Sequence, residues 1–203
     1  MGWHKQSTKP CDHHPVHTKP CGSVDYTPGV VELFFDQYRP DNRINHTLTK
    51  ELALYVIVYS PLQMAADLPE HYEQFPGPFQ FIRDVPADWQ DTRVLHGDVG
   101  NYVTIARKER NSDEWYLGSI TDEHGRLLET PLSFLDAGTT YVAEIYRDGL
   151  EADWITDPYS FEIEQKLVTS QTVMNLRLAA GGGQAVRFRP ASEGDLERFE
   201  HYE

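Results

Sequence analysis

The chain has 203 residues, which is long enough to bury a hydrophobic core, and 39% of them are apolar. Its formal net charge is −14 at pH 7. A surface this acidic repels nucleic-acid phosphates and anionic lipid, so we expect no nucleic acid and no membrane as partners. Neutral ligands such as sugars remain open.

The N-terminal region is rich in residues that break regular structure. The stretch TKPCDHHPVHTKPCG, residues 8–22, repeats Thr-Lys-Pro-Cys and holds both cysteines of the chain. Zinc binds sulfur and imidazole, so one interpretation is a metal site made of Cys11, His13, His14, His17 and Cys21. A disulfide between the two cysteines is a second interpretation. The spacing matches no recognised zinc finger, and no export signal precedes the cysteines, so neither interpretation is favoured.

The segment TLTKELALYVIVYSPLQMAADL, residues 47–68, is the most apolar part of the chain and predicts a helix. Thr47 or Thr49 can cap its beginning, and Pro61 is expected to kink or restart it. Apolar residues occupy nearly the whole circumference of this helix. We therefore expect it to be buried on most sides.

Residues 69–100 are rich in proline and aromatic residues and predict a boundary with short helical turns. From residue 101 the pattern changes to short β runs separated by turn residues. We predict about seven strands in a small antiparallel sandwich, at residues 101–108, 114–120, 127–135, 140–149, 159–168, 172–179 and 184–190. The acidic tail ASEGDLERFEHYE is expected to fray, with a short terminal helix as the alternative.

Several motifs, in one order along the chain, resemble glycoside hydrolase family 97. They extend from about residue 22 to 190. They are GSVDYTPG (22–29), LALYV (52–56), YSPLQMAADLP (59–69), FIRDVP (81–86), YVTIAR (102–107), EWYLG (114–118), YRDG (146–149) and AGGG (180–183). Because several independent motifs keep this order, the resemblance is more specific than one short match.

The resemblance implies a fold and an activity. Members of this family hydrolyse α-glucosidic or α-galactosidic bonds, and they have an N-terminal β-sandwich, a central (β/α)8 barrel and a C-terminal β-sandwich. The implied fold class is an α+β fragment, with the last strand and helix of a (β/α)8 barrel followed by an all-β antiparallel C-terminal sandwich. The implied division is a barrel remnant at 1–80, the sandwich domain at 81–190 and an acidic tail at 191–203.

Glycoside hydrolysis needs two carboxyl groups that flank the scissile bond. The resemblance implies that the family's acid, its base and the ligands of its calcium ion precede residue 1, so we expect neither catalytic residues nor a cofactor in this chain. It would then be a truncated or frame-shifted product that is inactive alone. Asp25 and Tyr26 end the expected last barrel strand and are candidates to line the substrate. The alternative is a turn in which Asp25 bonds its own backbone.

The implied partners are an α-linked oligosaccharide in the complete enzyme and the missing part of the barrel. Family members are typically periplasmic or secreted, whereas the N-terminus shows no signal peptide, so the location stays open. One alternative function is a stand-alone carbohydrate-binding or scaffolding sandwich, in which Trp89, Trp115 or Trp154 would stack on sugars. Core packing is the more ordinary role of such tryptophans. A small zinc protein is a further alternative.

Overall fold

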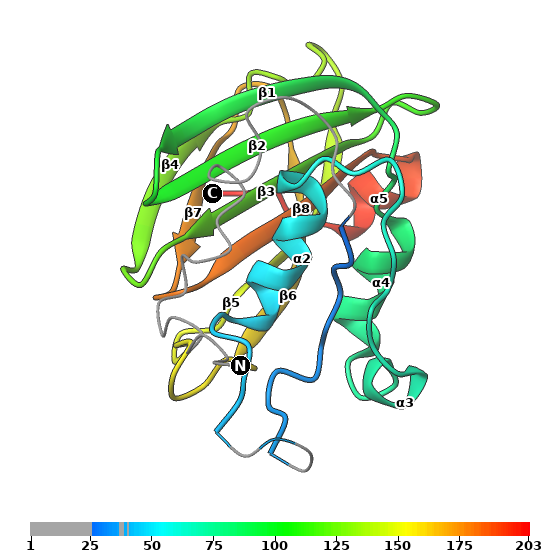
Figure 1. Ribbon diagram of the computed structural model, residues 1–203. Coiled ribbons are helices and arrows are strands. Elements are labelled where there is room, and N and C mark those ends of the chain that lie inside the picture. The colour runs from blue at the N-terminus through cyan, green and yellow to red at the C-terminus, as the bar shows by residue number, and fades with distance from the viewer. Residues whose placement is uncertain (1–25, 37–38, 40) are drawn as a thin grey trace.

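The computed structural model describes residues 26–36, 39 and 41–203 (Figure 1). Asp25 and all five residues of the metal and disulfide hypotheses lie outside this described part. The strands are β1 (Trp89–Asp98), β2 (Tyr102–Glu109), β3 (Trp115–Thr121), β4 (Arg126–Pro131), β5 (Tyr141–Asp148), β6 (Phe161–Val168), β7 (Val173–Leu178) and β8 (Gly183–Pro190). The helices are α2 (Leu48–Ile57), α3 (Pro69–Tyr72), α4 (Pro76–Asp84) and α5 (Glu193–Arg198). All of the described helices are too short to cross a membrane.

The strands form two antiparallel sheets. Six strands pair in the order β1-β2-β3-β8-β5-β6, and β4 pairs with β7 in a second sheet. The expected all-β antiparallel sandwich is therefore confirmed, and each of the seven predicted strands overlaps one of β2 to β8. The boundaries expected at residues 80 and 190 stay predictions.

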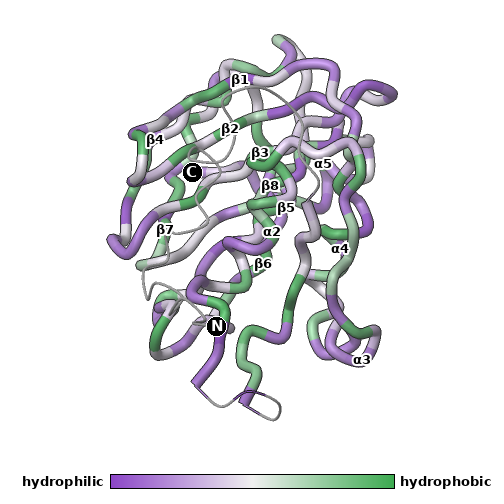
Figure 2. The backbone as a smooth tube through the Cα atoms, viewed as in Figure 1, coloured by the Kyte–Doolittle hydropathy of each residue, from purple (hydrophilic) through white to green (hydrophobic). Residues whose placement is uncertain are grey.

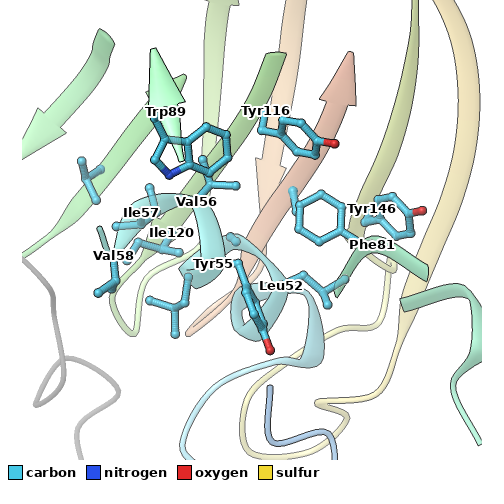
Figure 3. Packing of buried hydrophobic residues seen from close by; sticks show 14 residues of the cluster. Leu52, Tyr55, Val56, Ile57, Val58, Phe81, Trp89, Tyr116, Ile120 and Tyr146 are labelled. Carbon is cyan, nitrogen blue, oxygen red and sulfur yellow. The ribbon is translucent and has the colours of Figure 1, made fainter. Parts of the chain in front are cut away.

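The buried residues of the described part form three clusters. One joins Val31 and Leu33 to Leu48 of α2 and Tyr72 of α3. The other two form layers, one on each face of the six-stranded sheet. One layer lies between the two sheets. The other lies between the six-stranded sheet and helices α2 and α4, and Figure 3 shows Phe81 of α4 beside Tyr116 and Tyr146 of the sheet. Strand β3 is buried along its whole length because both of its faces are covered. Figure 2 shows that many turns between strands are hydrophilic.

The prediction for residues 89–98 is wrong. Residues 69–100 are predicted to form a boundary with short helical turns, but residues 89–98 form strand β1. Within this range the helical parts are α3 and α4. The sequence WQDTRVLHGD alternates poorly because β1 is an edge strand whose pairing with β2 shifts twice, near Trp89 and near Val94. Each shift changes which face the next side chain takes, so the period of two is lost from the sequence.

The helix and the tail also differ from their expected forms. Thr47 caps α2 as predicted, since its hydroxyl accepts a hydrogen bond from the Lys50 amide, but the helix ends at Ile57 rather than near residue 68. Val58 is extended, and the Ser60-Pro61 pair that follows favours an extended backbone. The tail forms α5, the short terminal helix given as the alternative to fraying, because Ser192 and Asp195 make a reciprocal capping box.

The N-terminal end of α2 is attached to the sheet by a buried carboxylate. Asp148, at the end of β5, accepts a hydrogen bond from the Thr49 hydroxyl. It also accepts from the backbone amides of Ala179 and Gly183, at 2.9 and 3.0 Å. Burial raises the pKa of Asp148, while these hydrogen bonds act in the opposite direction. One side chain thus connects α2, β5 and the turn between β7 and β8.

The C-terminal end of α2 is attached by a buried arginine. Arg107 of β2 donates to the carbonyl oxygens of Val56 and Ile57, at 2.6 and 3.3 Å, and to the hydroxyl of Thr92 at 2.9 Å. Burial lowers its pKa to about 10, so the guanidinium stays charged at neutral pH. The last carbonyl groups of a helix have no partner within it, and here the sheet supplies one.

Two glycines let α2 approach the sheet closely. A Cβ atom at Gly118 of β3 would lie 2.6 Å from the Ala53 carbonyl oxygen and 3.0 Å from the Val56 Cβ. A Cβ atom at Gly183 of β8 would lie 2.7 Å from the Lys50 Cα. The all-round burial expected for this helix is confirmed, and much of it comes from the sandwich itself.

We predict that Gly118→Ala destabilises the protein by roughly 1–3 kcal/mol, because the new methyl group would push the backbone of α2 away from the sheet. Chemical denaturation followed by circular dichroism measures this change. Gly97→Ala is the matched control, since its methyl group would meet Val94 and Val103 at ordinary distances of 3.9 and 4.0 Å. Equal effects of the two substitutions would contradict the close approach.

Candidate functional site

Tyr26 is the expected substrate-lining residue that falls in the described part of the chain. It is half-buried and pairs with Gln63 in an isolated parallel bridge. Burial, followed by the charges of Glu51 and Tyr55, raises the pKa of Tyr26 well above its ordinary value. The Tyr26 phenol therefore stays protonated at neutral pH and can act as a hydrogen-bond donor.

The segment that follows Tyr26 is held by side chains, and the first of them is Glu51. This residue lies in the first turn of α2 and is buried. Its Oε1 accepts hydrogen bonds from the amides of Gly29 and Val30, at 2.6 and 3.3 Å. Its Oε2 lies 2.7 Å from Nε2 of His46. A carboxylate in this place also interacts favourably with the N-terminal end of the helix dipole.

Asp67 holds the next two residues in the same way. Its Oδ2 accepts from the amides of Val31 and Glu32, both at 2.8 Å, and its Oδ1 lies 2.5 Å from Nδ1 of His71. Burial raises the pKa of Asp67, but the hydrogen bonds from Glu32, His71 and the Leu68 amide outweigh it and hold the pKa below its ordinary value. Four consecutive amides, from residue 29 to 32, are thus bound by two carboxylates.

Tyrosine hydroxyl groups complete the arrangement. Tyr72 donates to the Gly29 carbonyl oxygen at 2.6 Å, and Tyr159 accepts from the Leu33 amide at 2.7 Å. Burial raises the pKa of Tyr72 to about 12, so it remains a donor. Gly29 has a φ of +92°, and a Cβ atom there would collide with the Tyr55 hydroxyl, so only glycine fits this position.

These contacts define what the site can do. Glu51 and Asp67 are engaged by backbone amides and histidines, so neither has the geometry of a general acid or a nucleophile. Calcium takes six to eight oxygen ligands, and carboxylates that accept N–H groups do not fit it. The arrangement instead fixes the backbone path from Tyr26 to Leu33. The absence of catalytic residues from this chain, the role of Asp25 and the role of Tyr26 all remain predictions.

An acidic cluster near Asp122 could also be read as a metal site, but its contacts within the described residues have a structural explanation. Ligand atoms of Asp122, Glu123 and His124 lie within 4.8 Å of one another, but Arg126 already donates to the Asp122 carboxylate. Desolvation raises the pKa of Asp122, but hydrogen bonds from Arg126 and His124 lower it far more. Asp122 and Arg126 therefore form an ion pair. The Arg126 guanidinium already occupies the position at the Asp122 carboxylate that a metal ion would take.

Two of the three tryptophans proposed to stack on sugars are core residues. Trp89 is 7% exposed and Trp115 is 2% exposed, and both pack edge-on or tilted against other aromatic rings. Trp154 is half-buried, near the guanidinium of Arg43. The sequence alone does not distinguish a core tryptophan from a sugar-binding one, because tryptophan side chains pack in hydrophobic cores and also stack on sugars.

Comparison with known proteins gives a consistent result. The family described as "Glycosyl-hydrolase 97 C-terminal, oligomerisation" matches residues 88–189, about half of the chain. A retaining alpha-galactosidase of Bacteroides thetaiotaomicron is 33% identical over 172 residues, which is 83% of this chain and 25% of that protein. A probable retaining alpha-galactosidase of Streptomyces bingchenggensis is 29% identical over 164 residues, covering 81% and 23%.

A solved structure extends the match to the fold. A glycoside hydrolase family 97 enzyme from Pseudoalteromonas sp. strain K8 is 47% identical, with a TM-score of 0.81 over 84% of this chain and 27% of that one. It was solved with panose and with acarbose. The chain spans about a quarter of the length of the relatives it matches.

We predict that the hold on residues 28–33 weakens in acid. The pKa of Asp67 in the folded protein lies below the unfolded value of about 3.9, so its stabilisation is present above pH ~3.9 and is lost as the pH falls through the folded-state pKa. Asp67→Asn should therefore destabilise the chain by about 1–3 kcal/mol at pH 7 and by progressively less as the pH falls below ~3.9.

Urea unfolding at pH 7, 5 and 3 measures this difference. Asp91→Asn is a suitable control because its side chain is 43% exposed and makes local contacts, with Arg93 and with the Thr92 amide. A difference between Asp67→Asn and wild type that is the same at all three pH values would contradict the assignment.

Proposed function

This chain belongs to glycoside hydrolase family 97, and from this premise we propose that it is the C-terminal part of an enzyme that hydrolyses α-glycosidic bonds in oligosaccharides. The observation that carries the proposal is the 47% identity to the Pseudoalteromonas enzyme, with the same fold, over 84% of the chain. That match extends well beyond the sandwich and so includes residues outside the 88–189 range of the family match.

The function of these residues would be to position rather than to catalyse. Helix α2 is fixed on the sandwich at both ends, and its Glu51, together with Asp67, fixes the backbone that follows Tyr26. If Asp25 and Tyr26 line the substrate, this arrangement holds them in place through the backbone. The acid, the base and the calcium ion would belong to the remaining part of the enzyme, and the location would be periplasmic or secreted.

We favour an α-glucoside as the substrate over an α-galactoside. The relative solved with panose and acarbose is 47% identical to this chain, whereas the retaining alpha-galactosidase from Bacteroides is 33% identical. Both comparisons support an α-linked oligosaccharide as the broader class.

A stand-alone carbohydrate-binding module is the second candidate, and the structure gives it little support. Trp89 and Trp115 are buried in the core and have no face available to a sugar ring. Trp154 is half-buried, and the Arg43 guanidinium lies over its ring. We therefore expect no saturable change in tryptophan fluorescence when the chain is titrated with panose. A saturable change at millimolar sugar would favour the binding module.

The proposal predicts that this chain replaces the matching part of a relative. In a hybrid, the aligned C-terminal 27% of the Pseudoalteromonas enzyme is exchanged for the aligned 84% of this chain. We expect the hybrid to hydrolyse an aryl α-glucoside within about tenfold of the parent, which corresponds to about 1.4 kcal/mol in the barrier. The 203-residue chain alone should show no turnover of aryl α-glucosides or α-galactosides.

A parent enzyme that lacks the exchanged part is the negative control. A soluble hybrid without activity would overturn the proposed function. Turnover by the isolated chain would overturn the positioning role.

A further inference from the structure

Two histidines repeat one arrangement, each beside a carboxylate. Nε2 of His46 lies 2.7 Å from Oε2 of Glu51, and Nδ1 of His71 lies 2.5 Å from Oδ1 of Asp67. In each pair the other carboxylate oxygen accepts hydrogen bonds from two consecutive amides of residues 29–32. An ionised carboxylate only accepts hydrogen bonds, so the imidazole nitrogen is the donor in both pairs. Each carboxylate is therefore held between an imidazole and the backbone.

The imidazole donors determine which way the carboxylates face. The last torsion of an Asp or Glu side chain has only broad preferences, so a carboxylate that is bound at one oxygen can still turn. A donor at the second oxygen removes this freedom and keeps the first oxygen directed at the amides. At Asp67 the Leu68 amide also donates to Oδ1, at 2.8 Å. We therefore expect His46 to contribute more than His71.

Both histidines lie on parts of the chain that are anchored in the fold. His46 directly precedes Thr47, whose amide donates to the Gly181 carbonyl oxygen at 3.2 Å, in the turn between β7 and β8. His71 belongs to α3, and the next residue, Tyr72, is buried in a hydrophobic cluster. The positions of the two imidazole groups are thus set by the fold, and they can orient the carboxylates beside them.

We propose that His46 and His71 are positioning residues of the enzyme, which act through Glu51 and Asp67 on the backbone of residues 29–32. This inference rests on the proposed function, because that backbone adjoins the residues expected to line the substrate. The histidines contact no substrate in this role. Their loss would let the carboxylates turn and the backbone shift, and a small displacement of groups near the reacting atoms lowers the rate strongly.

The test uses amide side chains that place an N–H group at one imidazole nitrogen or at the other. The terminal nitrogen of glutamine can stand where Nε2 of histidine stands, and that of asparagine where Nδ1 stands. His46→Gln with His71→Asn therefore keeps both hydrogen bonds. His46→Asn with His71→Gln moves both donors to the wrong position. The two double variants have the same amino-acid composition, so each is the matched control of the other.

Activity is the first measurement. In the hybrid enzyme, the variant that keeps the donors should retain kcat on the aryl α-glucoside within about threefold of the wild-type hybrid. The variant with moved donors should lose at least about tenfold in kcat, with KM changed by less than about threefold, because positioning acts on the transition state more than on binding.

Amide hydrogen exchange of the isolated chain, followed by NMR, is the second measurement. The amides of residues 29–32 should exchange at least about tenfold faster in the variant with moved donors than in the variant that keeps them. The amides of β3 should exchange at the same rate in both, since this strand lies in the core of the sandwich.

Each outcome has a distinct meaning. Equal kcat values of the two double variants in an active hybrid overturn the positioning role and leave the proposed function intact. If both variants lose activity alike, the charge or the ring of histidine is what matters, and the role as a directed donor is overturned as well. Equal amide exchange in the two variants overturns the orientation of the carboxylates. A wild-type hybrid without activity overturns the proposed function, and the exchange measurement then decides the orientation by itself.

Discussion

The attachment of helix α2 to the six-stranded sheet depends on two buried polar side chains, one at each end of the helix. The Asp148 carboxyl group lies at the N-terminal end and the Arg107 guanidinium at the C-terminal end. Burying a polar group is costly unless hydrogen bonds replace its water, and here the N–H and C=O groups of turns and of the helix end supply them. Each side chain thus satisfies backbone groups that would otherwise be buried without partners, so the attachment is directional.

The position of α2 determines the position of the segment that contains Tyr26. Glu51 is carried by the first turn of the helix, and Gln63 bonds to carbonyl groups at its far end. The segment itself has almost no sheet partners. The sandwich therefore sets the position of α2, and side chains that bond to the segment then set the path of its backbone. A displacement of α2 would move both ends of this path together, so the close approach of α2 to Gly118 and Gly183 also sets the position of the segment.

The sequence predicts those parts of this structure in which a local pattern and the tertiary environment agree. The alternation in β2 and β5, the cap at Thr47 and the burial of α2 are all visible in the order of residues. Strand β1 is not, because its bulges break the period of two. The roles of Glu51 and Asp67 are also hidden, since a carboxylate that accepts backbone amides 20 to 40 residues away has the same sequence signal as a solvated one. An Asp or Glu inside an otherwise apolar segment is the signal that can be used, because such a residue needs buried partners.

The same reasoning connects the two unusual parts of residues 47–69. In α2 the apolar circumference is matched by buried surroundings, so the polar residues that remain, Glu51 among them, must bond within the protein. Beyond Ile57 the apolar character continues while the burial stops, although the backbone is still tied down by Gln63 and Asp67. The change from buried to exposed therefore lies in the surroundings of the chain and not in its composition. The two polar side chains, Gln63 and Asp67, mark the face of residues 61–69 that stays attached to the fold.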